Sequence, residues 1–301
     1  MRDDPVAESK GLLYFTDGSL AYAGRYSHQD TFDAHTHSFV EIAVVLGGQG
    51  NHHTMTGDTP LTRGDVVLLR PGTWHGYTEC RDLELFNCCF SAELLTRELA
   101  WTQEDPIISY LLSTGPYSMH RRGMLTAHLD EPALEEALVH LDGLDDLRRR
   151  PLTQHRADVI GRLSLFLGNL ARAVAEANFV TSAGPTHPAV VQAMRALESR
   201  VAHDWTLVEL ADRLHLTSSY LVRLFKSETG LPPMAYLARQ RVEAAADLLL
   251  HTDDSVSVIG ELVGWNDQNY FARRFKAHFG LSPSAYRKRF TTRSAQLSPP
   301  E

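Results

Sequence analysis

Residues 219–239 read SYLVRLFKSETGLPPMAYLAR, and residues 269–289 read NYFARRFKAHFGLSPSAYRKR. Aligned at an offset of 50 without a gap, the two stretches share ten identical residues in 21 positions, far above chance. The shared residues are Tyr220, Arg223, Phe225, Lys226, Gly230, Leu231, Pro233, Ala235, Tyr236 and Arg239, with their partners 50 positions later. The repeat predicts that one structural unit occurs twice in the last 115 residues.

The first copy has the pattern of two short helices joined by a tight turn. A supporting helix is predicted from apolar residues at helical spacing, namely Leu207, Leu210, Ala211 and Leu214. The segment 217–219, Thr-Ser-Ser, offers N-caps for a second helix, which Gly230 ends. That helix is apolar on one side only, at Leu221, Leu224 and Phe225.

The second copy repeats this plan. Gly264 lies in the predicted turn, Asn266 or Asp267 can cap the second helix, and Phe271 and Phe275 face inward. Residues 233–250 between the copies read as one helix of about 27 Å, close to the ~34 Å between successive major-groove faces. One chain is therefore expected to place both second helices on one side of a DNA duplex.

The outward faces of both second helices carry side chains suited to DNA. Arg can bridge guanine, Gln and Asn can pair with adenine, and Lys and Tyr can reach phosphates. A solvated face on a helical interaction domain is the alternative, but two copies with matching arginines favour DNA. The expected DNA-binding residues are Ser219, Tyr220, Val222, Arg223, Lys226, Gln268, Asn269, Tyr270, Arg273 and Arg274.

Residues 187–290 resemble the DNA-binding domain of the AraC/XylS family of bacterial regulators, most closely over GWNDQNYFARRFKAHFGLSPSAYRKRF (264–290). The resemblance implies double-stranded DNA and RNA polymerase as partners and favours activation. It also implies base-reading roles for Ser219, Val222, Arg223, Gln268, Asn269, Tyr270 and Arg273. One departure is His215, where such turns often carry Gly; His tolerates positive φ, so the fold is still expected.

Residues 31–90 read as short strands, because apolar runs such as EIAVVL alternate with turn signals. His35 and His37 share a strand face, with Glu41 following, and Trp74 and His75 come after a Pro-Gly turn. This pattern resembles the cupin barrel, although it lacks that family's glycine six residues before His35 and its asparagine after His75. The order of the domains is similar to that of the rhamnose regulators.

Three interpretations of this cluster stay open. His35, His37, Glu41 and His75 can hold a divalent transition metal. The same residues with Trp74 can instead bind a small polar effector, such as a sugar, without metal. They can also be a structural cluster of satisfied histidines. No cofactor is required by the sequence, and His52, His53 and His120 are expected at the surface without a role.

The sequence predicts an α+β protein of two domains. Residues 1–179 form a cupin-like antiparallel β-barrel with following helices, expected from about Glu93 to Phe179. Residues 180–188 form a linker, 189–290 an all-α domain with two helix-turn-helix units, and 291–301 a disordered tail. Leucine stripes in helices over 130–179 are expected to form a homodimer contact or to pack on the barrel.

Charge and composition fit this organisation. The chain has a net charge of −8, yet residues 187–301 carry 14 Lys and Arg against 12 Asp and Glu. Three cysteines without a CxxC pair argue against a disulfide framework or a zinc finger. The polar first residues lack a signal peptide, and no run reaches the ~20 apolar residues of a membrane span. A cytoplasmic protein is expected.

The predicted function is a sequence-specific transcription regulator that responds to a small polar effector bound in the barrel. The alternative is a metal-dependent cupin enzyme fused to a DNA-binding module. The chain contains no second catalytic constellation, so we expect a regulator and not an enzyme.

Overall fold

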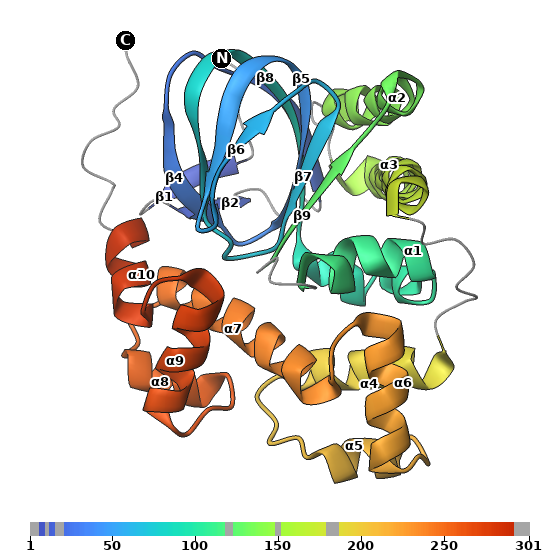
Figure 1. Cartoon of the computed structure of the whole chain (residues 1–301), viewed down its shortest axis with the longest axis vertical. Helices are drawn as coiled ribbons and strands as arrows, with labels where there is room; N and C mark the ends of the chain where they lie inside the picture. Colours follow the sequence, from blue (N-terminus) through green and yellow to red (C-terminus); the bar gives the residue numbers. More distant parts are fainter. Residues whose placement is uncertain are drawn as a thin grey trace.

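The computed structural model describes residues 6–9, 12–15, 21–117, 123–147, 152–178 and 187–291. A barrel-like sheet domain lies on one side and a helical domain on the other, as Figure 1 shows. The predicted two-domain α+β class is therefore confirmed. The predicted linker and tail fall outside the described residues, apart from His187 and Pro188 of the first and Thr291 of the second. Pro188 is already the first residue of a helix.

The sheet of the first domain has the order β1-β2-β4-β8-β5-β7-β9, with β3 paired to β8 and β6 paired to β5. All its pairs are antiparallel except β2 with β4. The strands are β1 (Val6–Ser9), β2 (Leu12–Phe15), β3 (Ala21–His28), β4 (Phe32–His37), β5 (Val40–Thr54), β6 (Gly57–Leu61), β7 (Asp65–Leu69), β8 (His75–Phe90) and β9 (Met124–His128).

The first half of β5, from Val40 to Leu46, is buried on both faces, which explains why it is apolar apart from Glu41. Val40, Ile42 and Val44 pack in the core that the barrel shares with the helices. Val45 belongs to a second cluster formed by barrel strands alone, with Leu61, Val67 and Leu85. Alternate residues of a strand point to opposite faces, so Glu41 lies on the same side as Val45.

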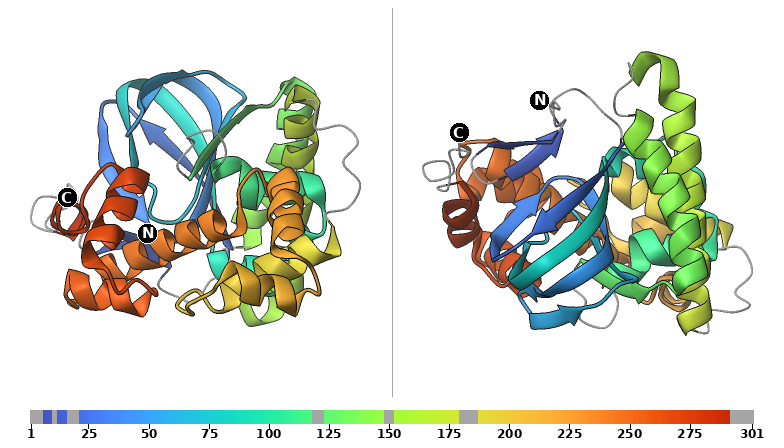
Figure 2. Two further views of the ribbon diagram at one scale, coloured as in Figure 1. Left: turned by 60° about the horizontal axis from the view of Figure 1, so that its bottom comes forward. Right: turned by 90° about the horizontal axis from the view of Figure 1, so that it is seen from above.

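The helices that follow the barrel pack against its outer side (Figure 2). Short helical segments come first: the 3-10 helices η1 (Ala92–Thr96) and η2 (Ala100–Gln103), the α-helix α1 (Pro106–Ser109), the π-helix η3 (Tyr110–Thr114) and the 3-10 helix η4 (Gly115–Tyr117). The long helices are α2 (Glu131–Leu147) and α3 (Leu152–Asn178). Leu134, Leu141, Leu163 and Leu170 are buried in the shared core. Of the two predicted roles for the leucine stripes, packing on the barrel is the one observed.

The expectation of helix from Glu93 to Phe179 was wrong at β9. Residues Met124–His128 pair with β7 along its whole length, from Leu69↔Met124 to Asp65↔His128. The segment MLTAH is too short to show strand periodicity, and it becomes a strand because the edge of β7 needs a hydrogen-bonding partner.

The second domain consists of helices α4 (Pro188–Ser199), α5 (Leu207–Arg213), α6 (Ser218–Thr229), α7 (Pro233–His251), α8 (Val256–Leu262), α9 (Gln268–Phe279) and α10 (Pro283–Thr291). They form two groups with separate cores, and α7 contributes to both. In Figure 1, α7 runs between the two groups beneath the barrel. No helix among the described residues is long and apolar enough to cross a membrane.

Candidate functional site

Helices α6 and α9 are built alike at both ends. Thr217 caps α6 by accepting a hydrogen bond from the Tyr220 amide, and Asp267 caps α9 by accepting from the Asn269 and Tyr270 amides. Both helices end on a glycine with φ of +75°, Gly230 and Gly280. A left-handed residue after the last turn suits glycine because it has no Cβ to clash. The duplicated sequence therefore produces duplicated helices with matching boundaries.

The turns before the two helices differ by one residue. The supporting helices α5 and α8 are 49 residues apart, whereas α6 and α9 are 50 apart. His215 takes the first turn with φ of +55°, and Gly264 takes the second with φ of +89°. His is among the residues that tolerate this conformation, as expected from the sequence.

The outward faces of α6 and α9 carry the predicted DNA-binding residues. Two of them, Val222 and Arg274, are half-buried, and eight are exposed, namely Ser219, Tyr220, Arg223, Lys226, Gln268, Asn269, Tyr270 and Arg273. Tyr220 and Tyr270 are each 41% exposed, so the two copies present equivalent aromatic rings. The buried sides carry Leu221 and Phe225 in α6, and Phe271 and Phe275 in α9.

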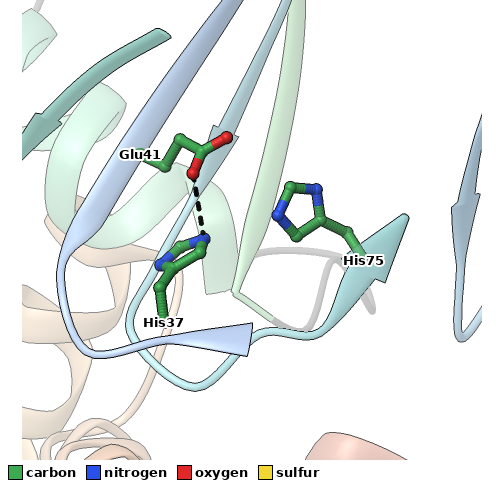
Figure 3. Close-up of side chains that lie close together, drawn as sticks. All are labelled: His37, Glu41 and His75. Carbon is green, nitrogen blue, oxygen red and sulfur yellow. Dashed lines mark ion pairs between the residues drawn. The ribbon is translucent and has the colours of Figure 1, made fainter. Parts of the chain in front are cut away.

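A second cluster lies inside the barrel, where His37, Glu41 and His75 converge (Figure 3). One ligand atom from each residue lies within 4.8 Å of the other two. His37 comes from the end of β4, Glu41 from the start of β5 and His75 from the start of β8. The Nε2 atom of His37 lies 3.5 Å from Glu41 Oε2, the contact dashed in Figure 3.

Burial shifts the pKa of each group toward its neutral form. Loss of solvent lowers the pKa of His37 to about 3, with a further contribution from His35. Loss of solvent also raises the pKa of Glu41 to about 8 and holds the pKa of His75 well below its ordinary value. The three residues are at most 2% exposed. Without a bound cation, the cluster is therefore uncharged near neutral pH.

The hydrogen bonds leave ring nitrogens that suit a metal ion. His37 Nδ1 donates to the Phe39 carbonyl at 2.8 Å, so its Nε2 carries the lone pair. His75 Nδ1 lies 3.3 Å from His52 Nε2, and a bond donated by Nδ1–H leaves the lone pair on His75 Nε2. Neither Nε2 has a hydrogen-bond partner among the described residues. Two imidazoles and one carboxylate match a divalent transition metal.

Two predicted members of the cluster, His35 and Trp74, are not among the three converging ligands. His35 is half-buried, its Nδ1 lies 3.1 Å from the Asp33 carbonyl, and it is not in the group of three converging ligands. The backbone of His35 pairs with that of His75, and the centroids of the two rings are therefore only 4.3 Å apart. Trp74 points toward the second domain, where its Nε1–H donates to the Phe279 carbonyl at 3.0 Å.

The expectation that His52 lies at the surface was wrong. It is 2% exposed, and its ring packs near His75 and Tyr77. Register shifts in β5 between Val45 and Asn51 change which residues face inward, so strand alternation counted from Glu41 does not find His52. His53 is partly exposed and pairs with Asp58, while His120 lies outside the described residues.

The barrel cluster is close to contacts with the second domain. Thr36 Oγ1 donates to Tyr286 Oη at 3.0 Å, and Tyr286 in turn donates to the Gly72 carbonyl at 2.8 Å. The Gly72 amide donates to the His37 carbonyl at 2.9 Å. Arg70 forms a buried ion pair with Glu243 of α7, at 3.1 Å. The strand ends that carry His37 and His75 are thus the ones that touch α7, α9 and α10.

Comparison with known proteins finds one match in the sheet domain and its following helices and another in the helical domain. Residues 18–141 match the AraC-like ligand binding domain, and residues 210–289 match a helix-turn-helix domain. The HTH-type transcriptional activator RhaR of Yersinia pestis bv. Antiqua (strain Angola) is 27% identical over 290 residues, which cover 96% of each chain. The RhaR of Mannheimia succiniciproducens is 26% identical over 95% of this chain and 98% of its own.

Among solved structures, ToxT from Vibrio cholerae has a similar fold, with a TM-score of 0.52 and 12% identity over 91% of this chain and all of that one. A ligand-binding sheet domain joined to two helix-turn-helix units defines a transcriptional regulator that binds DNA and carries a sensor domain. The chain has the domain organisation of AraC-type regulators, an AraC-like ligand binding domain followed by a helix-turn-helix domain, and is similar over nearly its whole length to HTH-type transcriptional activators.

Proposed function

We propose that the protein activates transcription by placing α6 and α9 in successive major grooves, under control of a small polar effector such as a sugar. The observation that carries the proposal is the pair of matched, exposed rows on α6 and α9, each built on a buried apolar face. Helix α7 spans about 28 Å between the units, near the ~34 Å of one helical turn of DNA. Activation implies contact with RNA polymerase, as the family resemblance suggests.

Selection of bound DNA from a random pool tests this function. The full chain should enrich sequences with two short conserved blocks about one helical turn apart. Recovery of unrelated sequences at every round would mean that the exposed arginines are only a solvated face.

For the barrel cluster we propose a divalent transition metal held by His37, Glu41 and His75. Two buried Nε2 atoms without hydrogen-bond partners and an adjacent carboxylate support a cation more than a neutral sugar. The bound ion would supply positive charge that holds Glu41 ionised. His37, Glu41 and His75 would then fix the ends of β4, β5 and β8, which contact the second domain.

Metal analysis of the purified full chain tests this assignment. We expect about one equivalent of metal per chain, and loss of it in His37→Ala together with a lower melting temperature. His53→Ala, on the same barrel but outside the cluster, is the matched control. A metal content that does not differ between the two variants would contradict the site.

The same burial argues for a regulator and against the enzyme alternative. A substrate must reach the reacting atoms, yet the three ligands are almost fully covered. The relatives with similar sequences are named as transcriptional activators, which supports the same conclusion.

We also propose that the chain forms a homodimer. The leucine stripes of α2 and α3 are used in the core, so a dimer contact would need the opposite faces, where Val139 is 64% and Leu165 57% exposed. Sedimentation of the full chain tests this: Leu165→Glu should shift a dimer toward monomer, and a wild-type monomer at tens of micromolar would contradict it.

A further inference from the structure

A cavity of about 430 Å³ lies between the two domains. Its first wall comes from the ends of barrel strands and the turn after β8, including Ser38, Arg70 and Ser91. Its second wall comes from α4 and α7, including Glu198, Gln240 and Glu243. The volume falls within the range of about 300–1,000 Å³ that small-molecule sites occupy. This cavity is separate from the closed histidine cluster, although Ser38 follows His37 directly.

The polar groups of the wall are organised and partly buried. Arg70 and Glu243 have side chains only 6% and 8% exposed, and their ion pair joins the two walls. Arg70 also donates to the Leu112 carbonyl at 3.2 Å. A buried guanidinium held by a carboxylate and a carbonyl is preorganised, so little further ordering is needed when a ligand binds.

The remaining carboxylates of the wall already have partners. Glu198 accepts hydrogen bonds from Gln103 Nε2 at 2.7 Å and from the Tyr236 hydroxyl. Asp247 forms an ion pair with His251 at 2.9 Å. Glu243 and Asp247 are ion-paired, and burial raises the pKa of Glu198 and so favours its neutral form, so these acids do not select a cation.

The other lining groups are neutral and polar. Serine and threonine hydroxyls line the barrel side, and the Gln240 amide lines the α7 side. Hydroxyls and amides can both donate and accept, and this combination matches a molecule that carries many hydroxyls. Apolar residues complete the wall, with Pro71, Ala92 and Leu95 on the first side and Val201 and Ala244 on the second.

We propose that this interdomain cavity is the effector site and that it takes a neutral, hydroxyl-rich molecule of monosaccharide size. The inference rests on the proposed regulatory function and names the site of its effector. A ligand there touches the barrel and α7 at once, so it stabilises one arrangement of the two domains. Any change in that arrangement reaches α6 and α9 through α7, which contributes to both helix-turn-helix cores.

A wider cavity of about 900 Å³ lies elsewhere on the barrel and is the competing location. It is lined by residues such as Gln49, Glu79 and Arg81, and Arg81 is exposed. All of its lining residues belong to the first domain, so a ligand there would not join the two domains. The interdomain cavity is favoured because its walls contain buried charged groups from both.

Thermal unfolding of the full chain with neutral sugars tests the proposal, because a ligand that binds only the folded state raises the melting temperature. The probes are L-rhamnose, L-arabinose and D-xylose, with D-glucosamine as a cationic comparison. At least one neutral sugar should raise the melting temperature of the wild type. Ala244→Phe, which fills the cavity, should reduce the affinity at least tenfold.

Ala157→Phe adds the same ring at an exposed position of α3 and should leave the sugar response unchanged. Gln240→Leu keeps the side-chain size and removes the amide, so it should also weaken binding if Ala244→Phe fails to fold. Retained response in these cavity variants, loss of response in Arg81→Ala alone, or a response only to D-glucosamine would overturn the proposal. A wild type that binds selected DNA but no neutral sugar would overturn this site assignment and leave the DNA-binding function standing.

Discussion

Arg223 and Arg273 stand at the same place on α6 and α9, one helical turn after the exposed tyrosine of each copy. Both guanidinium groups lie on the exposed face. Arg can bind guanine through two hydrogen bonds, to O6 and N7, and so discriminates this base from the others. Recognition of guanine by these two arginines is the most specific part of the proposed function.

Arg273→Ala should cost roughly 1–3 kcal/mol on the selected site and relax base preference at one position. The measurement is a titration of the selected duplex and of random DNA at one salt concentration. An equal loss on both would mean that Arg273 contacts only phosphate.

Glu41 predicts a pH dependence of stability in the metal-free protein. The unfolded chain releases this proton near pH 4.5, whereas burial holds the folded pKa at about 8. Between these values the folded state binds more protons, so the contribution of Glu41 to the free energy of unfolding falls as the pH rises. Glu41→Gln should remove that part of the decline between pH 5 and 8.

Urea denaturation of chelator-treated protein at pH 5, 6.5 and 8 measures this effect. Glu135→Gln, an exposed carboxyl on α2, serves as the control and should keep the wild-type pH profile. Identical profiles for wild type and Glu41→Gln would contradict the shift.

For single residues, the sequence predicts which side chains belong to the barrel cluster better than it predicts which residues surround each of them. The convergence of His37, Glu41 and His75 is expected from the spacing of a cupin-like motif, although the three residues come from three different strands and not from one strand face. The direction of Trp74 depends on a second domain more than 200 residues away, to which it donates a hydrogen bond. No pattern local to residues 71–75 contains that information.

Among the secondary-structure elements, the duplicated helices were the easiest to predict, because caps, apolar faces and terminal glycines all agree. The structure bears out Thr217 and Asp267 as caps and Gly230 as the end of α6. Strand β9 was missed, because five residues carry too little periodicity and their partner β7 lies more than 50 residues earlier.

Substitution of the two N-cap residues tests whether the caps stabilise their helices. Asp267 accepts two amide hydrogen bonds at 2.9 Å, while Thr217 accepts one at 3.3 Å. Asp267→Ala should therefore lower the free energy of unfolding by about 1–2 kcal/mol and Thr217→Ala by less. Chemical denaturation measures both, with the exposed Asp254→Ala as control. Equal losses for Asp254→Ala and Asp267→Ala would show that the cap contributes nothing.

For the whole molecule, the junction between barrel and helices is the feature that sequence patterns did not reveal. The sequence suggests a separate apolar core for each domain, but apolar residues of the two domains pack together at this junction. Trp74 of the barrel clusters with Phe275, Phe279 and Tyr286 of the helical domain. Two domains with a common core are expected to unfold together. The division into a sheet domain and a helical domain was predictable because composition and periodicity change along the chain.

Gly72 lies at this junction with φ of +80°, and a Cβ there would lie 2.8 Å from Ala246 Cβ and 2.9 Å from Phe279. Gly72→Ala should separate one thermal transition into two by loosening the contact. Gly57 also has a positive φ, of +113°, but open space around it, so Gly57→Ala adds only backbone strain. Calorimetry measures this: two transitions already in the wild type would contradict a cooperative junction, and a single transition in Gly72→Ala would contradict the predicted role of Gly72 in it.

The central claim is that one chain reads two successive major grooves with two copies of one unit. Footprinting of the full chain on its selected DNA tests this most directly, using wild type, Arg223→Ala and Arg273→Ala. We predict a protected tract of about two helical turns, in which each variant loses protection at a different end. Protection of a single short block, or loss of the same block in both variants, would contradict the claim.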